Sequence, residues 1–146
     1  MKIFSPDFQH NQAIPPKFTC EGDDLNPELV ISDIPEEAKS LALIVDDPDA
    51  PMGMWVHWVV YNIPPTLSRI AEHSIPGKQG TNDFGRLNYG GPCPPSGEHR
   101  YFFKLYALDA TLNLKEDATK KQLEEAMKGH ILNKAELVGR YRKVYE

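Results

Sequence analysis

The sequence has few of the features that mark membrane proteins or nucleic-acid-binding proteins. No apolar run approaches the length of a membrane span, and residues 1–7 do not resemble an apolar signal region. The net charge is −5, so the excess of basic residues that is typical of nucleic-acid-binding proteins is missing. The sequence therefore predicts a cytoplasmic protein with no integral membrane association and no nucleic-acid partner.

Cysteine is scarce. The chain has two cysteines, Cys20 and Cys93, and they match neither a zinc-binding spacing nor a redox CxxC motif. Two buried thiols are the favoured interpretation for an intracellular protein, and a long-range disulfide is the alternative.

The common catalytic motifs are also missing. The sequence contains no GxSxG elbow, P-loop or GxGxxG, and its five histidines show no HxH or HxxxH spacing. Ser96 lies close to His99 in the sequence, but nothing places a base and an orienting acid around it as a serine nucleophile requires. We therefore expect a protein that is not an enzyme and that uses no metal and no cofactor. A hydrolase that uses Asp and His residues is the alternative.

Proline and glycine, in contrast, are abundant. Thirteen prolines and ten glycines in 146 residues indicate long ordered loops and short strands rather than a helical bundle. The length fits one domain, and no linker or repeat divides it, so we expect a single domain over residues 1–146.

Five segments have the pattern of strands: residues 28–32, 40–46, 54–63, 99–109 and 130–144, the last interrupted by Gly139. Strict alternation in residues 54–63 predicts that His57 shares a face with Trp55, and that Trp58 lies on the other face. The sequence predicts a mainly β fold, an antiparallel sandwich, with one main helix near the C-terminus. Thr119 and Gln122 form a capping box for that helix, and Gly129 suits its end.

An acidic turn, residues 46–51, follows the most apolar of these strands. Asp47 and Asp49 each adjoin a proline, which restricts the backbone around them. One interpretation is turn chemistry, in which Asp side chains bond to their own backbone. The other is a carboxylate fixed at the end of a buried strand, where it can bond a ligand or a histidine. His57 on the next strand can likewise be a core residue or a ligand contact.

A second group lies farther along the chain. His99 and Tyr101 open a strand after a loop rich in glycine and proline that contains Gly91. Glycine lets backbone N–H groups approach an anion, a protonated imidazole supplies charge, and a phenol supplies a neutral donor. Together these residues predict a small anion site.

This combination of motifs resembles the phosphatidylethanolamine-binding protein family, also called the Raf kinase inhibitor-like family, and more narrowly its short prokaryotic branch. The resemblance covers nearly the whole chain. It rests on Asp47-Pro48-Asp49-Ala50-Pro51, Trp55-Val56-His57, Gly91-Pro92 and His99-Arg100-Tyr101.

The resemblance implies a pocket at one end of the sandwich that accepts phosphate, acetate or a phosphorylethanolamine head group. Carried over by motif, the pocket consists of Asp47, Asp49, Pro51, Trp55, His57, Gly91, His99 and Tyr101. In this interpretation His99, Tyr101 and the Gly91 backbone face the anion, and Asp47 holds an imidazole or takes an ammonium group. The expected function is non-catalytic binding of a small anionic ligand that modulates a kinase or protease partner. A protein-interaction module with a vestigial pocket is a further alternative.

Two departures from the eukaryotic members are visible. Cys93 stands where many of those members have a second proline, so one wall of the pocket is altered. The sequence ends at Glu146, whereas they continue into a C-terminal helix beside the pocket. Without this helix, a surface beside the pocket is free to pair with a second copy of the chain, and we therefore hypothesise a homodimer.

Overall fold

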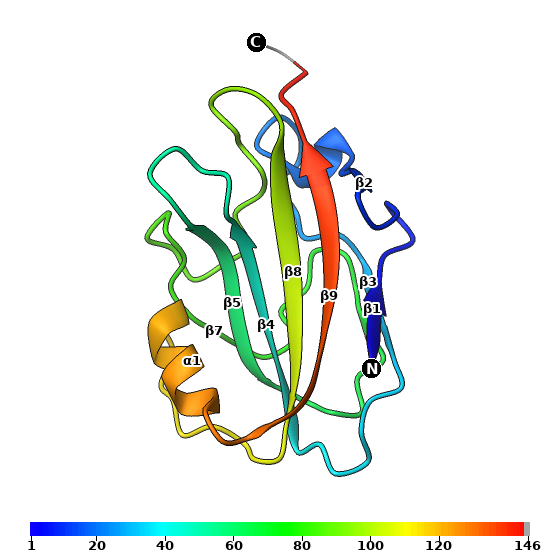
Figure 1. Ribbon diagram of the computed structural model, residues 1–146, viewed down its shortest axis with the longest axis vertical. Coiled ribbons are helices and arrows are strands. Elements are labelled where there is room, and N and C mark those ends of the chain that lie inside the picture. Colours follow the sequence, from blue (N-terminus) through cyan, green and yellow to red (C-terminus); the bar gives the residue numbers. More distant parts are fainter. Residues whose placement is uncertain (145–146) are drawn as a thin grey trace.

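The computed structural model shows two β-sheets that face each other, with one α-helix on the outer face of the larger sheet (Figure 1). The structure describes residues 1–144. The larger sheet has the order β2-β9-β8-β4-β5-β7, and the smaller sheet has the order β1-β3-β6. Neighbouring strands are antiparallel except for β2 and β9. The predicted mainly β sandwich with one helix is therefore confirmed.

The strands of the larger sheet, in chain order, are β2 (Gln12–Ala13), β4 (Ser40–Asp47), β5 (Trp55–Ile63), β7 (Lys78–Gln79), β8 (His99–Leu108) and β9 (Ile131–Tyr141). The smaller sheet consists of β1 (Lys2–Phe4), β3 (Leu29–Ser32) and β6 (Arg69–Ile70). A short 3-10 helix, η1 (Pro16–Phe18), lies between β2 and β3.

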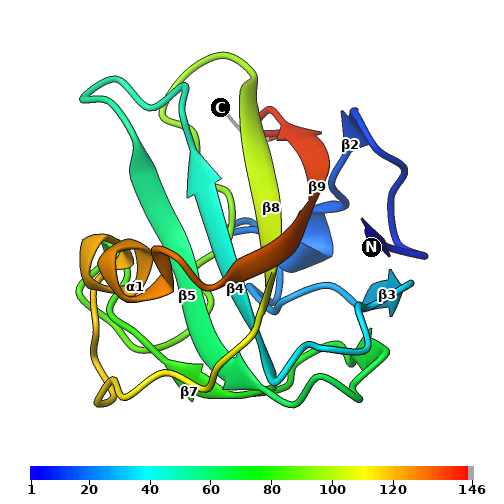
Figure 2. The same ribbon diagram turned by 60° about the horizontal axis from the view of Figure 1, so that its bottom comes forward.

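Strand β4 is buried on both faces, as its unbroken apolar sequence predicts. Leu43 and Val45 point into the core between the two sheets, where they pack with residues of β3 and β8. Ala42 and Ile44 point the other way, toward α1 (Lys120–Met127). Figure 2 shows α1 beside β5. Because both faces are covered, the end of β4 holds its side chains in fixed positions.

The helix is capped as the sequence predicts. The Thr119 side-chain oxygen accepts a hydrogen bond from the Gln122 backbone N–H, and the Gln122 side chain accepts one from the Thr119 N–H. Gly129 follows the helix with a φ of 79°, a conformation that favours glycine. Of the described helices, none is long and apolar enough to cross a membrane.

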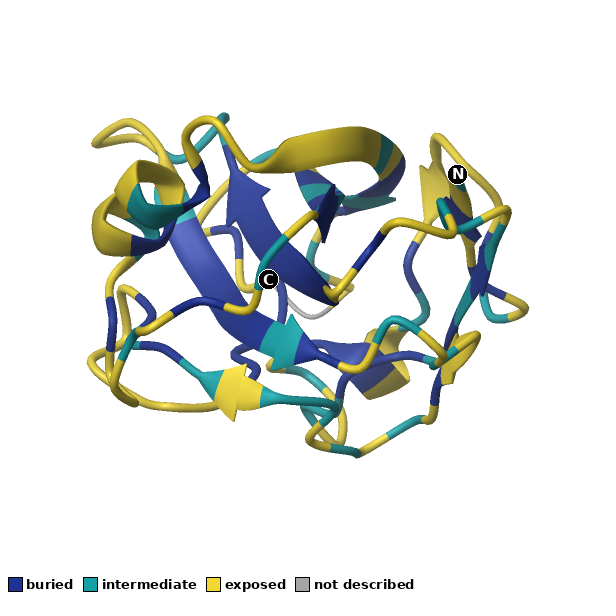
Figure 3. Ribbon diagram, turned by 90° about the horizontal axis from the view of Figure 1, so that it is seen from below, coloured by how far each residue is buried: buried dark blue, intermediate teal, exposed yellow. Residues whose placement is uncertain are grey.

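Strand β9 runs without interruption through Gly139, so the predicted break at this glycine is wrong. Gly139 pairs with Tyr101 of β8 on one side and with Gln12 of β2 on the other. A Cβ atom at Gly139 would lie 2.4 Å from Cγ1 of Ile14. The glycine therefore serves close packing rather than a bend. Figure 3 shows the exposed first half of β9 and the buried strands at the centre of the sheet.

Strand β5 contains a bulge at His57, and the predicted strict alternation is wrong at this point. Val45 pairs with Trp58, whereas the next residue, Asp46, pairs with Val56, so His57 is an extra residue in β5. As a result Val56 lies in the cluster that packs against α1, and Trp58 lies in the core between the sheets. The bulge turns His57 away from regular strand pairing at the end of the sheet.

Candidate functional site

A cavity of about 190 Å³ lies where β4 ends and where β5 and β8 begin. These three strands are antiparallel neighbours, so the last residue of one and the first residues of the others meet at the same end of the sheet. The wall contains two imidazoles and one carboxylate among mostly apolar groups. The lining residues are Asp47, Ala50, Pro51, Met52, Trp55, His57, Phe84, Cys93, Pro94, Pro95 and His99.

Asp47 and His99 form a buried pair in this cavity. Nδ1 of His99 lies 2.7 Å from Oδ2 of Asp47, and the two side chains are only 8% and 4% exposed. The second carboxylate oxygen, Oδ1, accepts a hydrogen bond from the Asp49 N–H at 2.7 Å. Asp47 therefore does both things that were predicted for it: one oxygen bonds to the backbone of its own turn, and the other bonds to a histidine. Because Nδ1 of His99 is engaged, Nε2 is the ring nitrogen left for a ligand.

His57 is held in the same way by a backbone carbonyl. Its Nδ1 donates to the Gly90 oxygen at 2.6 Å. Burial lowers the pKa of His57 below its ordinary value of 6.5, and the Gly90 carbonyl and the Asp47 carboxylate oppose part of this shift. The imidazole is thus neutral at neutral pH, with its proton on Nδ1 and an unprotonated Nε2 that accepts hydrogen bonds.

The segment after β7 fixes this bulge from outside. The Asn82 side chain donates to the His57 carbonyl at 3.2 Å and to the Asn88 carbonyl at 2.7 Å. The Asp83 carboxylate accepts from the Val56 N–H at 2.7 Å. These contacts place the next residue, Phe84, against the His57 ring with a centroid separation of 5.3 Å. Phe84 lines the cavity, although it was not among the residues predicted for the site.

Tyr101 lies behind the two histidines rather than in the cavity wall. Its ring contacts the His57 ring edge-on at 5.2 Å and stacks on the His99 ring at 6.5 Å. Burial and the nearby Asp47 carboxylate raise the pKa of Tyr101 well above its usual value, so the phenol stays protonated. The Cys93 backbone beside the hydroxyl opposes part of this shift in the Tyr101 pKa. The phenol therefore lies between the two histidines and the loop that carries Cys93.

Asp49, predicted as a pocket residue, lies on the rim and forms an ion pair with Arg100. Its carboxylate accepts hydrogen bonds from the Arg100 backbone N–H, Nε and Nη2, each at 2.9 Å. These hydrogen bonds lower the pKa of Asp49 to about 2. The pair ties the turn after β4 to the start of β8 and thereby supports the cavity from outside.

Gly91 also lies outside the cavity lining. Its N–H, predicted to face an anion, donates instead to Oδ1 of Asp24 at 2.7 Å. A Cβ atom here would lie 2.4 Å from the Phe18 carbonyl oxygen and 2.9 Å from Thr19 Cα. The glycine permits the loop before β8 to approach the N-terminal segment closely.

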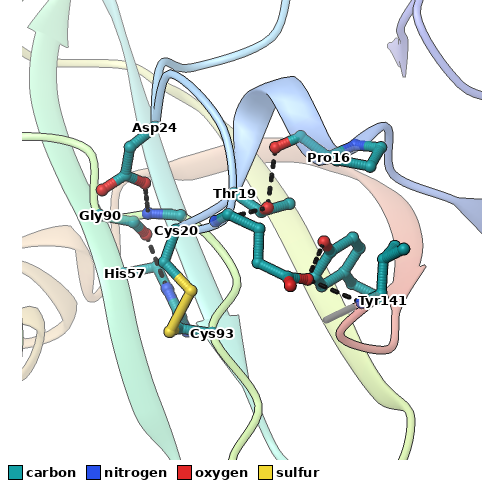
Figure 4. The surroundings of a disulfide bond; sticks show 11 residues. Pro16, Thr19, Cys20, Asp24, His57, Gly90, Cys93 and Tyr141 are labelled. Atoms are coloured by element: carbon teal, nitrogen blue, oxygen red, sulfur yellow. Dashed lines mark hydrogen bonds between the residues drawn. A yellow bond between two sulfur atoms is a disulfide. The ribbon is translucent and has the colours of Figure 1, made fainter. Parts of the chain in front are cut away.

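Cys20 and Cys93 form a disulfide with a Cα–Cα distance of 5.4 Å, so the favoured interpretation of two buried thiols is wrong. Both cysteines are exposed. Figure 4 shows that the bond joins the segment of Asp24 to the segment of Gly90. Sequence reasoning could not choose the disulfide, because the fold alone brings these distant residues together.

The structure thus gathers Asp47, Pro51, Trp55, His57 and His99 around one cavity, and it places Asp49, Gly91 and Tyr101 around that cavity as supports. Sequence reasoning missed five further wall residues: Ala50, Met52, Phe84, Pro94 and Pro95. The available signals were that Ala50, Met52, Pro94 and Pro95 lie within or beside the motifs, and that Phe84 belongs to Asn82-Asp83-Phe84-Gly85, which also resembles the family. Within residues 1–144, no cluster of three or more His, Cys, Asp or Glu side chains could hold a metal ion.

Known proteins have similar sequences and folds. The sequence profile of the phosphatidylethanolamine-binding protein family matches residues 4–142. A UPF0098 protein from Pyrococcus horikoshii is 52% identical, over 93% of this chain and 74% of its own length. A UPF0098 protein from Methanothermobacter thermautotrophicus is 48% identical, over 98% of this chain and 99% of its own.

Two crystal structures agree with this match. A phosphatidylethanolamine-binding protein homologue from Chlamydia trachomatis superposes with a TM-score of 0.95 at 48% identity, covering 97% of both chains. YbcL from Escherichia coli, described as a member of the mammalian family, superposes with a TM-score of 0.90 at 29% identity, covering 97% of this chain and 98% of its own. The chain therefore belongs to the phosphatidylethanolamine-binding protein family.

Proposed function

We propose that this protein binds a small anionic group, such as phosphate, a carboxylate or a phosphorylethanolamine head group, in the cavity at the end of the larger sheet. One observation carries the proposal. Two buried imidazoles, His57 and His99, line the same small cavity, and each has its Nδ1 engaged by the protein. Each ring therefore has Nε2 available, so one ligand can meet both.

The cavity suits a ligand of this size and charge. A volume of about 190 Å³ holds a group several times larger than a water molecule. Pro51, Trp55 and Pro94 contribute apolar surface to the wall, and charge interactions are stronger beside apolar groups than in bulk water. Binding an anion beside the neutral His57 favours uptake of a proton at Nε2, and a protonated phosphate can supply that proton itself.

Asp47 orients His99 in this scheme. Both carboxylate oxygens of Asp47 already accept hydrogen bonds from the protein. This supports the interpretation that Asp47 holds an imidazole, rather than the one in which it binds an ammonium group of the ligand.

The proposed binding is non-catalytic. The lining residues that the structure describes include no serine, threonine or free thiol, so the Asp47–His99 pair has no side-chain nucleophile to activate. A hydrolase would have to use the pair to activate water.

The surroundings of the cavity can also contact a protein partner. Met52 is 96% exposed and Met54 is 46% exposed, so an apolar surface lies beside the lining residues Pro51 and Trp55. We propose that a kinase or protease partner contacts this surface and that the bound anion modulates the contact.

Calorimetric titration with phosphate and with phosphorylethanolamine tests the binding. We expect His57→Gln and His99→Gln each to weaken binding about tenfold, which corresponds to one lost charge-assisted hydrogen bond. His130→Gln is the matched control, because His130 is exposed and pairs with Asp109 outside the cavity. Equal affinities in all three variants, or no binding by the wild type up to millimolar ligand, would refute the proposal.

A further inference from the structure

The Cys20–Cys93 disulfide is part of the wall of the proposed binding cavity. Cys93 lines the cavity together with Pro94 and Pro95, whereas Cys20 lies outside the lining. Both cysteines are exposed, so a thiol in solution can reach the bond without unfolding of the chain. Exposed disulfides are typically the labile ones, and buried disulfides are the structural ones.

The loop before β8 is hydrogen-bonded to the N-terminal segment up to Pro92 but not in the part that follows Pro92. Up to that residue, hydrogen bonds hold the loop to the N-terminal segment: Tyr89 Oη to the Phe18 carbonyl, the Gly91 N–H to Asp24, and the Cys20 N–H to the Pro92 carbonyl. From residue 93 to residue 97, the described chain forms no backbone–backbone hydrogen bond of this kind.

Pro94 and Pro95 cannot add such bonds, because proline has no N–H. The disulfide is the covalent tie that holds the cavity-lining part of this loop to the body of the protein, beside the contact of the Cys93 backbone with the Tyr101 phenol. Figure 4 shows the disulfide together with the hydrogen bond between His57 and the Gly90 carbonyl.

We propose that this disulfide is a thiol–disulfide exchange site whose reduction by a dithiol loosens the cavity wall and weakens anion binding. A thiolate of the dithiol attacks one sulfur, and the other leaves as a thiolate. The second thiol of the reductant then displaces the first cysteine. The dithiol becomes a disulfide, and Cys20 and Cys93 take up two electrons and two protons.

The physical reason for weaker binding is the loss of preorganisation. With the bond closed, Cys93, Pro94 and Pro95 are held against the cavity before a ligand arrives. With the bond open, the ligand must order this segment, and the ordering reduces its net affinity. The hydrogen bonds at Gly91 and Pro92 remain, so the rest of the fold is retained.

The test compares oxidised and dithiothreitol-treated wild-type protein without denaturant. We expect thiol titration to find both cysteines reduced, circular dichroism to be unchanged, and phosphate binding to weaken roughly tenfold. Cys20→Ser is the matched variant, because it breaks the bond without changing a lining residue. It should bind phosphate as weakly as the reduced wild type and should not respond to dithiothreitol. A bond that is reduced only in denaturant, or equal phosphate affinity in both redox states, overturns the proposal.

This inference rests on the proposed anion binding, and a second measurement separates the two. If the oxidised protein does not bind phosphate, the proposed function fails. Backbone amide NMR signals of Trp55 and His57 then report on the wall without a ligand. We expect both signals to shift on reduction and in Cys20→Ser, and unmoved signals contradict a disulfide that controls the wall.

Discussion

Asp47 and His99 are joined by a buried hydrogen bond, with 2.7 Å between Oδ2 and Nδ1, although they are 52 residues apart in the chain. The bond connects the end of β4 to the start of β8. It fixes one of the two imidazoles that line the cavity, so the carboxylate matters for stability as well as for binding.

Replacement of Asp47 by alanine should destabilise the protein by about 1–3 kcal/mol, because it leaves the buried Nδ1–H of His99 and the Asp49 N–H without their acceptor. Urea unfolding measures the change. Asp109→Ala is the control, since it removes an ion pair with His130 in which each side chain is 45% exposed, and it should change stability little. An Asp47→Ala variant as stable as the control would contradict this account.

The depressed pKa of His57 predicts a specific pH dependence of stability. The unfolded chain protonates this histidine near pH 6.5, whereas the folded chain does so only at lower pH. The unfolded state therefore binds more protons as the pH falls below 6.5, and stability is lost toward acid through this window. In His57→Gln, the free energy of unfolding should fall less steeply between about pH 7 and pH 5 than in the wild type. Identical slopes would show that His57 titrates normally in the folded protein.

Asp46, next to the site residue Asp47, is fully buried and is contacted by two lysines. Its Oδ2 lies 3.0 Å from Nζ of Lys104 and 2.8 Å from Nζ of Lys120. Either lysine alone keeps the carboxylate paired, so Lys104→Met and Lys120→Met should each be mild. The double variant should lose about 3–5 kcal/mol, because it leaves an uncompensated buried charge. A double-mutant cycle from urea unfolding tests the coupling between the two lysines. If the losses in the free energy of unfolding simply add, the two lysines do not act together on Asp46.

Gly91→Ala tests the close approach of the loop before β8 to the N-terminal segment. The new Cβ would meet backbone atoms of Phe18 and Thr19, which cannot move as a flexible side chain can. We expect a loss of about 1–3 kcal/mol in the free energy of unfolding and weaker phosphate binding. Ser96→Ala, at an exposed position of the same loop, is the control. Unchanged stability in Gly91→Ala would mean that the loop has room to shift.

The five longest strands and the helix could be predicted from the sequence, because burial and capping leave local patterns. The unbroken apolar run of β4 and the box of Thr119 and Gln122 are examples. The short strands β1, β2, β6 and β7 were not predicted, because two or three residues are too few to show such a pattern. The bulge at His57 could not be predicted, since it depends on which residues of β4 pair with β5. The disulfide likewise depends on the contact between two distant loops.

The site residues divide in the same way. The motifs that resemble the family led to the five predicted residues that line the cavity. They did not indicate that Asp49 pairs with Arg100 or that the Gly91 N–H is taken by Asp24. Those partners lie in other segments, and a sequence does not show which distant acidic and basic residues form a pair. The homodimer stays a prediction that light scattering can test.

The central claim is that one anion meets both imidazoles in this cavity. The most direct measurement is the NMR titration of the ring protons of His57 and His99 against pH, with and without phosphate. We predict that phosphate shifts both sets of signals and raises the pKa of His57, while the signals of the exposed His130 stay in place. Signals of His57 and His99 that do not respond to phosphate at any pH would contradict the account.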